Sequence, residues 1–318
     1  MESQLLIYKY QPKTLNDFIG NNNTQIFLNN MITKSPIPFI LLGSAESGKT
    51  SYLDSFINDY SSYNSVHSQY IAFKINSCKE QGINFFKNEV KLFCQTKELN
   101  KKKILAIDNL DQIPETSQHI IRFLIETYCK NILFIASATI IQKVIPSLQS
   151  HFITFYIEKP SNDDLLNYYY DISKKENVKI TKNQISIIMK STQKSIRKTI
   201  SLIEKFKILD QDFSDDEVKE ISFDISYVNF EKIIDELQND NIHKAVMCFL
   251  EIINLGYSCI DIYEYFYIYI KNSDLDENIK LNLVPIICKF ISNYYLNFEN
   301  KLDLIFFTNH LYTCLRKN

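Results

Sequence analysis

Residues 38–50 read PFILLGSAESGKT, and this stretch decides the fold of the first half of the chain. A short apolar run ends at Gly43, and residues 43–50 fit the pattern G-x-x-x-x-G-K-[ST] before a helical pattern begins. Glycines let the backbone turn so that successive N–H groups point at phosphate oxygens, and the start of a helix adds positive partial charge. The sequence therefore predicts a P-loop, in which Lys49 reaches the β- and γ-phosphates and Thr50 offers its hydroxyl to Mg²⁺.

A second element of a phosphate site follows roughly 60 residues later, with one strand–helix unit between. Residues 104–108 read ILAID, an apolar strand that ends in Asp108. This is the Walker B pattern, in which the carboxylate holds the Mg²⁺ coordination shell. A strand ending in Asp is common, so the pattern gains its meaning from its place after a P-loop.

Short apolar runs alternate with helical patterns between residues 36 and 157. The apolar runs are 38–42, 70–75, 103–107, 131–136 and 152–157, and the helical patterns are 49–60, 83–94, 116–128 and 141–147. Near-continuous apolar strands separated by helices are typical of a parallel sheet that is covered on both faces. The sequence predicts an α/β domain here.

Strand patterns stop after Lys159-Pro160, and residues 161–207 have the periodicity of helices, with a capping arrangement of Ser161 and Asp164 at the first. Residues 210–220 carry six acids against one Lys, which indicates a solvated linker or surface loop. Helical patterns rich in apolar residues return from about residue 226, and we expect them to be packed on more than one side. The expected division is 1–158, 159–210, an acidic linker at 211–225, and 226–318.

The composition is that of a globular protein, with 45% hydrophobic and 23% charged residues and a net charge of -2. Nucleic-acid binding must therefore come from local basic clusters. Seven scattered cysteines without a CxxC pair argue against a zinc site or a disulfide framework and suit a reducing compartment. No apolar run reaches the length of a membrane span and the first residues lack the pattern of a signal peptide, so we expect an intracellular protein without a membrane partner.

With these motifs in place, the chain resembles the small subunits of replication factor C, the sliding-clamp loader within the AAA+ ATPases. The similarity is spread over nearly the whole chain, in the same order and at similar spacing as in the family. Besides the P-loop, the similar stretches are Lys9–Asn21, Ile75–Ile83, Ala106–Asp111, Pro146–Phe152, Ser195–Lys198, Ile242–Ala245 and Glu299–Leu302.

The resemblance implies an AAA+ P-loop domain with a parallel five-stranded sheet, followed by a helical lid and an all-α collar that holds subunits together. It implies ATP and Mg²⁺ as ligands, and a hetero-pentamer with sibling subunits. Such a ring opens a sliding clamp and places it on primer–template DNA, in a nucleus or at a viral replication site.

The resemblance also implies roles for individual residues. The adenine would be bordered by Ile7 and Gln11, and Arg197 would contact the γ-phosphate as sensor 2. Sensor 1 falls on Thr139, or on Ala138 under a second alignment. The phosphates would lie on Gly43, Ser44, Ala45, Glu46, Ser47, Gly48, Lys49 and Thr50, with the Glu46 side chain pointing away from them. Thr50 and Asp108 would hold the metal, and Lys49, Asp108 and Asn109 would act in catalysis.

Two positions depart from the family pattern. Asn109 stands where the family has the catalytic Glu, and because an amide cannot accept a proton from water, we expect ATP to be bound but hydrolysed slowly. The alternative is that Asp111 or Glu115 takes over. His151 stands where the family has an arginine finger for the neighbouring subunit, and a neutral His cannot replace a guanidinium. We favour the interpretation that His151 is an ordinary surface residue at the start of a strand.

The family follows the DNA backbone with two helices inside the ring. The positions that match are Gln81, Gly82, Ile83 and Lys87 on one helix and Arg122 on another, while Phe123 stands in place of a second Arg. Phosphate contacts give affinity without sequence readout, which suits a protein that must accept any primer junction. Each of these residues could also be an ordinary exposed side chain.

Three functions remain open from the sequence. The chain could be an active ATPase motor, a nucleotide-binding structural subunit that hydrolyses little, or a different DNA-associated AAA+ ATPase such as an origin-recognition or helicase-loader protein. Asn109 and His151 favour the second function over the first. The collar-like end of the chain disfavours the third.

Overall fold

The computed structural model describes residues 5–20, 22–34, 36–64, 70–77, 82–96, 102–222, 225, 227–273, 275–296 and 300–316. The chain forms two compact units, of which the first comprises residues 1–175 and 195–204 and the second residues 176–194 and 205–318. The boundaries predicted after residues 158, 210 and 225 stay predictions.

The first unit is built on a five-stranded sheet in which every pair of neighbouring strands is parallel. The strand order is β2-β3-β4-β1-β5. The predicted parallel α/β fold is confirmed, and each predicted strand is present within two residues of its expected ends. The strands are β1 Phe39–Gly43, β2 Tyr70–Asn76, β3 Lys102–Asp108, β4 Ile132–Ala138 and β5 Ile153–Ile157.

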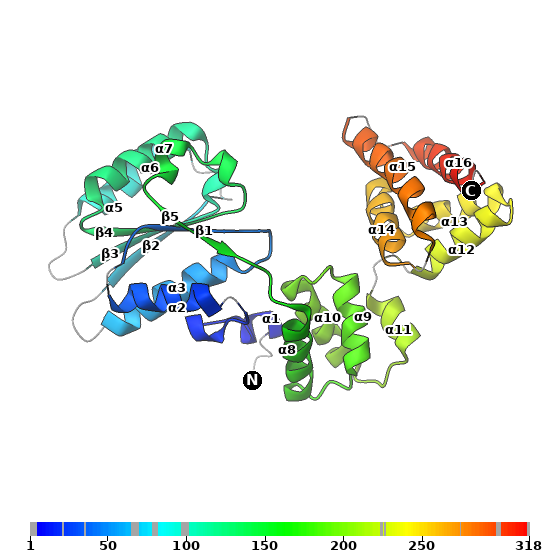
Figure 1. Cartoon of the computed structure of the whole chain (residues 1–318), viewed down its shortest axis with the longest axis horizontal. Helices are drawn as coiled ribbons and strands as arrows, with labels where there is room; N and C mark the ends of the chain where they lie inside the picture. Colours follow the sequence, from blue (N-terminus) through cyan, green and yellow to red (C-terminus); the bar gives the residue numbers. More distant parts are fainter. Residues whose placement is uncertain are drawn as a thin grey trace. The chain divides into compact units, whose positions relative to one another are not determined.

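Helices cover both faces of this sheet, as Figure 1 shows. Side chains alternate along the strands, so Phe39 and Leu41 of β1 pack against one layer while Ile40 and Leu42 pack against the other. The first layer holds α2 (Asn22–Thr33) and α3 (Lys49–Asn64), and the second holds α5 (Lys91–Gln95), α6 (Glu115–Tyr128) and α7 (Pro146–Gln149). Burial on both faces explains why the central strands β1, β3 and β4 are near-continuous in apolar residues, whereas the edge strands β2 and β5 are partly exposed.

Two of the predicted helices are interrupted. Residues 83–95 form α4 (Ile83–Phe85), a π-helical segment η2 (Phe86–Val90) and α5. The wider π turn keeps residues four apart on one side, and Phe86, Val90 and Cys94 are all buried. The single helix predicted at 141–147 is wrong, because the structure has a 3₁₀ turn η4 (Ile141–Lys143) and then α7. Pro146 disfavours helical backbone at the residue before it, and Ile145 is extended.

Short helical elements complete the start of the chain and the turn after β3. They are α1 (Leu6–Lys9) and the 3₁₀ turns η1 (Leu15–Asp17) and η3 (Leu110–Gln112).

The predicted helices after Lys159 are present as α8 (Asn162–Lys175), α9 (Lys182–Ser191) and α10 (Ile196–Leu209). The cap predicted for α8 is confirmed, because the Asp164 N–H donates to Ser161 Oγ at 3.2 Å and the Ser161 hydroxyl donates to the Asp164 carboxylate at 2.6 Å.

The acidic stretch is only partly the loop that we predicted, because it contains α11 (Asp215–Ser222). Its acids lie in the first turn, where carboxylates stabilise a helix, and Ser214 and Glu217 cap each other's backbone N–H groups. Val218 is buried, and α11 packs against α9. One apolar residue in an acidic sequence thus anchors the helix, a signal too weak to outweigh the charge pattern.

The helices predicted from about residue 226 onward are present, and the last five helices share a single apolar core. Phe266 lies near its centre, with ring contacts to Phe230, Phe249, Tyr269 and Phe307. The helices are α12 Tyr227–Gln238, α13 Ile242–Asn254, α14 Cys259–Asn272, α15 Glu277–Leu296 and α16 Lys301–Leu315. Within the described ranges, no single helix is long and apolar enough to cross a membrane, and α13 and α14 reach that length only as a pair bent by 118°.

Candidate nucleotide-binding site

The carboxyl ends of β1, β3 and β4 meet at one edge of the sheet, because these strands are neighbours and parallel. The P-loop leaves β1, Asp108 ends β3, and Ser137 lies near the end of β4. After β1 the chain enters α3 on one face of the sheet, and after β3 it enters α6 on the other face. Crevices at such switch points are where open α/β sheets bind ligands. The strand order therefore brings the two predicted phosphate-site motifs together.

The backbone of the P-loop has the shape of a phosphate cradle. A Cβ on Gly43 would lie 2.6 Å from Ser47 Oγ and 2.8 Å from the Ile157 carbonyl oxygen, so this position admits only glycine. Gly48 has a φ of 88° and Glu46 a φ of 61°, both in the left-handed region. Glu46 is exposed, and the direction of its carboxylate relative to bound phosphates stays a prediction.

Lys49 opens α3 and is 7% exposed. Its Nζ donates hydrogen bonds to the carbonyl oxygens of Gly43 at 2.9 Å and Ser44 at 2.8 Å, so the ammonium lies inside the loop. Burial lowers the pKa of the Lys49 ammonium, while the negative charges of Asp111 and Asp108 oppose part of that effect. The result is one ammonium enclosed by the loop that would receive a polyphosphate.

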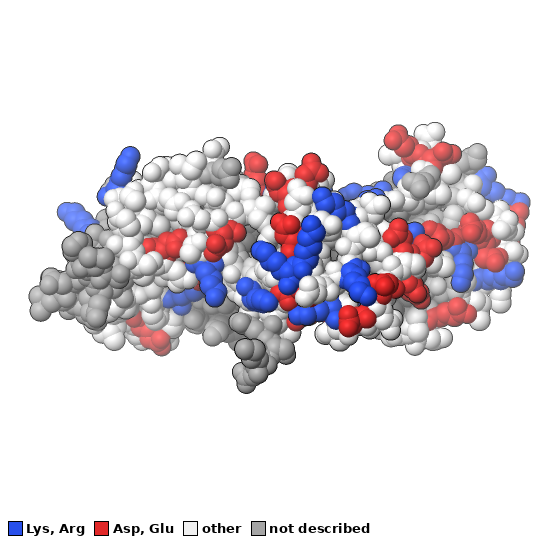
Figure 2. All heavy atoms as spheres, turned by 90° about the horizontal axis from the view of Figure 1, so that it is seen from below, with Lys and Arg blue, Asp and Glu red and all other residues white. Residues whose placement is uncertain are grey.

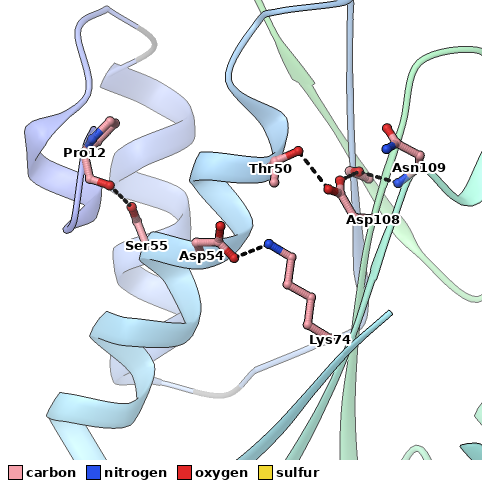
Figure 3. Close-up of polar contacts among 8 residues, drawn as sticks. Pro12, Thr50, Asp54, Ser55, Lys74, Asp108 and Asn109 are labelled. Atoms are coloured by element: carbon pink, nitrogen blue, oxygen red, sulfur yellow. Dashed lines mark hydrogen bonds and ion pairs between the residues drawn. The ribbon is translucent and has the colours of Figure 1, made fainter. Parts of the chain in front are cut away.

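Three hydroxyl groups donate hydrogen bonds to the oxygens of Asp108. The Thr50 hydroxyl donates to Asp108 Oδ2 at 2.8 Å (Figure 3), and the Ser137 hydroxyl donates to Oδ1 at 2.5 Å. The Ser77 hydroxyl donates to the Asp108 carbonyl oxygen at 2.6 Å. The two residues predicted to hold the metal, Thr50 and Asp108, are thus in direct contact.

The turn after Asp108 has an unusual backbone. Asn109 has φ 57° and ψ 54°, and its N–H donates to Ser137 Oγ at 2.9 Å. Asp111 is buried, and its Oδ2 accepts a hydrogen bond from the Ile140 N–H at 3.2 Å. Its Oδ1 has no hydrogen-bond partner among the described residues. The backbone at Asn109 is therefore a left-handed turn that is held by Ser137 of β4.

Helix α3, which begins in the P-loop, is anchored along its length. The Ser55 hydroxyl donates to the Pro12 carbonyl oxygen at 3.2 Å, and Asp54 pairs with Lys74 of β2 at 2.5 Å (Figure 3). The rings of Tyr52 and Phe18 stack with their centroids 3.6 Å apart, beside Gly48. The stacked rings hold the start of α3 against Phe18, while the other two contacts hold its second turn against Pro12 and β2.

The remaining predicted nucleotide ligands are spread around the P-loop domain. Ile7 is half-buried in α1, whose Leu6 N–H donates to Glu204 of α10 at 3.2 Å, while Gln11 is exposed. Thr139 is exposed directly after β4, and Arg197 is exposed on α10. Among the described residues, no hydrogen bond or ion pair links Thr139 or Arg197 to the P-loop, and their sensor roles stay predictions.

The candidate DNA-binding residues lie on the surface of the first unit. Gly82, Ile83 and Lys87 are exposed at α4 and η2, while Gln81 lies outside the described residues. Arg122 on α6 pairs with Glu126 at 3.1 Å. The face in Figure 2 has basic and acidic side chains interspersed, in keeping with the net charge of -2.

His151, at the position of the family's finger arginine, is half-buried. Its Nε2 lies 3.3 Å from Glu126 Oε1, the same oxygen that Arg122 contacts. Beside them on α6, Phe123 is exposed.

Sequence reasoning missed three residues that organise the site. Ser77 and Ser137 bind Asp108 as described above, and Gln118 is a buried amide on α6. The Gln118 Nε2 donates to the carbonyl oxygens of Ile113 and Lys143, both at 2.9 Å, and its Oε1 accepts from the Ile145 N–H at 2.9 Å. One signal was available, because Ser137 is a hydroxyl residue inside the otherwise apolar run ILFIASA.

Comparisons with known proteins agree with this geometry. Residues 39–159 match the model of the ATPase family associated with various cellular activities (AAA), and residues 227–292 match the Replication factor C C-terminal domain. The chain is 26% identical over 290 residues to the Replication factor C small subunit of Methanococcus maripaludis, covering 89% of this chain and 91% of that protein. It is 27% identical over 208 residues to the Replication factor C small subunit of Sulfolobus acidocaldarius, and this match covers 64% of this chain and 63% of that protein.

Solved structures of similar fold include a point mutant of Thermotoga maritima RuvB, with a TM-score of 0.55 and 14% identity over 74% of this chain and 80% of that chain. At this identity the likeness concerns the fold alone.

Proposed function

Because the chain belongs to the replication factor C small-subunit family of AAA+ ATPases, we propose that it is an ATP-binding subunit of a DNA sliding-clamp loader. In such a ring it would help to open the clamp and to place it at primer–template junctions. The observation that carries the proposal is the joining of a AAA ATPase domain and a replication factor C C-terminal domain in one chain, in that order. Sibling subunits, the clamp and DNA are the partners that the proposal names.

The residues of the P-loop fit a nucleoside triphosphate. Gly43 and Gly48 allow a backbone that a side chain would block or strain, and the Lys49 ammonium, now bound to two carbonyl oxygens, can turn to phosphate oxygens. A bound triphosphate would replace neutral acceptors by charged ones, and hydrogen bonds between charged groups are the stronger kind. We propose ATP as this ligand, with Ile7 and Gln11 beside its base.

The donor set around Asp108 fits Mg²⁺. No cluster of three or more His, Cys, Asp or Glu is present in the part of the chain that the structure describes, so a site for zinc or calcium is not built here. Mg²⁺ is usually held by one or two carboxylates together with substrate phosphates and waters, which Asp108 and the Thr50 hydroxyl could complete. When bound, the metal would neutralise charge that develops on the phosphates.

We propose that ATP hydrolysis at this site is weak. The side chain that follows Asp108 is the amide of Asn109, which can hold a water but cannot take its proton. Of the two alternative bases, Asp111 is buried, with Oδ2 accepting the Ile140 N–H and Oδ1 without a hydrogen-bond partner among the described residues. Glu115 is exposed in the first turn of α6. Nucleotide occupancy, more than turnover, would then be what this subunit contributes to the ring.

We also propose that His151 does not act as a finger toward a neighbouring subunit. It lies at a carboxylate that it shares with Arg122, and it has no guanidinium with which to stabilise a phosphoryl group. This position and Asn109 together support a structural, nucleotide-sensing role over that of a motor.

DNA binding is proposed through phosphate contacts of Lys87 and Arg122, with Gln81, Gly82 and Ile83 beside them. The Arg122–Glu126 pair is solvent-exposed, and such pairs contribute only about 0.2–1 kcal/mol, so a phosphate can compete for the guanidinium. Because the charge of the chain is -2, we expect tight DNA binding only in the assembled ring.

The alternative, an origin-recognition or helicase-loader ATPase, shares the AAA+ domain. The match of residues 227–292 to the Replication factor C C-terminal domain argues against it.

The proposal is tested by co-expressing the full chain with its sibling subunits and measuring ring assembly and clamp loading on primed DNA. Loss of the charged hydrogen bonds in Lys49→Ala should weaken ATP binding by about 10- to 100-fold and reduce loading. Lys190→Ala, which removes an exposed lysine of α9, should leave both unchanged. A folded wild-type chain without affinity for adenosine nucleotides, or without assembly with siblings, would overturn the proposal.

A further inference from the structure

We infer that Ser137 is a positioning residue for the Asp108 carboxylate, and that its hydroxyl sets how strongly Mg²⁺ promotes nucleotide binding. The inference rests on the proposed function, because it concerns the same nucleotide site.

Ser137 is the only polar residue of strand β4. Every residue of β4 is buried, and Ser137 is 0% exposed within it. A buried hydroxyl is costly unless it is hydrogen-bonded. Both of its hydrogen-bond partners, the Asp108 carboxylate and the Asn109 N–H, belong to the end of the neighbouring strand β3. The hydroxyl therefore connects β4 to the metal corner of the site.

The two oxygens of Asp108 are held from two different elements. Ser137 of β4 donates to Oδ1, and Thr50 of α3 donates to Oδ2. Donors on opposite oxygens fix the rotation of the carboxylate about its Cβ–Cγ bond. Thr50 is itself a proposed metal ligand, whereas the Ser137 hydroxyl, among the described residues, is hydrogen-bonded to Asp108 and Asn109. Ser137 is thus the contact that can orient the carboxylate both before and after a metal arrives.

The same hydroxyl also holds the backbone that follows. It accepts the N–H of Asn109, whose φ of 57° is uncommon for a residue other than glycine. On the other side of Asp108, the Ser77 hydroxyl holds the carbonyl oxygen. Loss of the Ser137 hydroxyl would free the carboxylate and the turn together, while Ser77 and the P-loop would stay in place.

The experiment compares the full-length wild type with Ser137→Ala and with a matched control, Ser55→Ala. Ser55 is also a buried serine whose hydroxyl donates a hydrogen bond, but the acceptor is the Pro12 carbonyl, away from Asp108 (Figure 3). Binding of a fluorescent ATP analogue is measured across a Mg²⁺ titration and in excess EDTA. Hydrogen exchange of the peptide that contains Asn109 is measured without nucleotide.

Groups that orient metal ligands typically change metal affinity by about 10- to 100-fold when they are removed. We therefore expect Ser137→Ala to need about 10- to 100-fold more Mg²⁺ for the half-maximal increase in binding of the ATP analogue. Its affinity for the analogue in EDTA should be unchanged, and hydrogen exchange at Asn109 should be faster. Ser55→Ala should keep the wild-type Mg²⁺ titration. A general loss of packing would instead weaken binding equally with and without Mg²⁺.

The outcomes separate the two proposals. If the wild type binds the analogue with Mg²⁺ and Ser137→Ala keeps the wild-type titration, or weakens binding equally in EDTA, the positioning role is wrong while the proposed function stands. If the wild type has no nucleotide affinity at all, the proposed function fails and the inference falls with it.

Discussion

Replacing Asn109 by Glu puts a carboxylate directly after Asp108, and we expect it to raise the rate of ATP hydrolysis. The amide of Asn109 can orient a water, but only a carboxylate can accept its proton. General-base catalysis of this kind contributes typically about 10²- to 10⁴-fold. On the scale of about 1.36 kcal/mol per tenfold, that is roughly 2.7–5.5 kcal/mol of transition-state stabilisation.

The backbone sets the cost of this substitution. Asn109 has φ 57° and ψ 54°, a region in which Asn is enriched and Glu is not. A residue held there costs of order 1–3 kcal/mol, and we take about 1 kcal/mol as the extra cost of Glu over Asn. If all of that cost fell on the active conformation, the rate would drop by about fivefold. The net gain should therefore be at least about 20-fold.

The assay is single-turnover hydrolysis in the assembled ring, with the other subunits' sites inactivated so that only this site is read. Asn109→Gln is the matched control, because it has the length and backbone cost of Glu but no carboxylate. Equal rates for Asn109→Glu and Asn109→Gln would refute the reasoning. Asp111→Asn in the wild-type background should have little effect, and a large loss there would assign the base to Asp111.

Three further predictions concern stability, thiol reactivity and the pH dependence of stability. Gly43→Ala brings a methyl group to 2.6 Å from Ser47 Oγ and 2.8 Å from the Ile157 carbonyl oxygen. This overpacking should lower the free energy of unfolding by about 1–3 kcal/mol, which a lower midpoint of chemical unfolding would show. Gly82→Ala, whose Cβ would have no atom of a described residue within 4 Å, is the control, and equal midpoints for the two variants would contradict the packing argument. Burial raises the pKa of the Cys94 thiol to about 11, so at pH 8 iodoacetamide should label the exposed Cys129 and spare Cys94 in peptide mapping by mass spectrometry. Because the unfolded thiol ionises near pH 9 while the folded thiol stays protonated, stability should fall as the pH rises from about 9 to about 11, and Cys94→Ala should lack this component.

The strands and most helices could be predicted because their signals are local. Apolar runs marked all five strands, of which the central three are buried on both faces, and the Ser161–Asp164 cap marked the start of α8. The predictions failed where a tertiary contact or a single residue outweighed the pattern. The burial of Val218 stabilises a helix within an acidic stretch. Pro146 divides the helix predicted at 141–147.

The residues of the candidate site could also be predicted only in part. The P-loop and the strand that ends in Asp108 could be recognised from the sequence, because glycine spacing and the carboxylate's place at a strand end are properties of short segments. The roles of Ser77, Ser137 and Gln118 could not, since each depends on a hydrogen bond to a residue far along the chain.

The sequence by itself therefore determined the order of the elements, the phosphate loop around Lys49 and the departure at Asn109. Only the tertiary structure decided which groups surround Asp108, where a hydroxyl from β4, 29 residues away, meets the carboxylate. The physical reason is that periodicity and turn chemistry act over a few residues. The neighbours of a strand end, in contrast, follow from the strand order β3-β4-β1, which is fixed by the packing of the whole sheet.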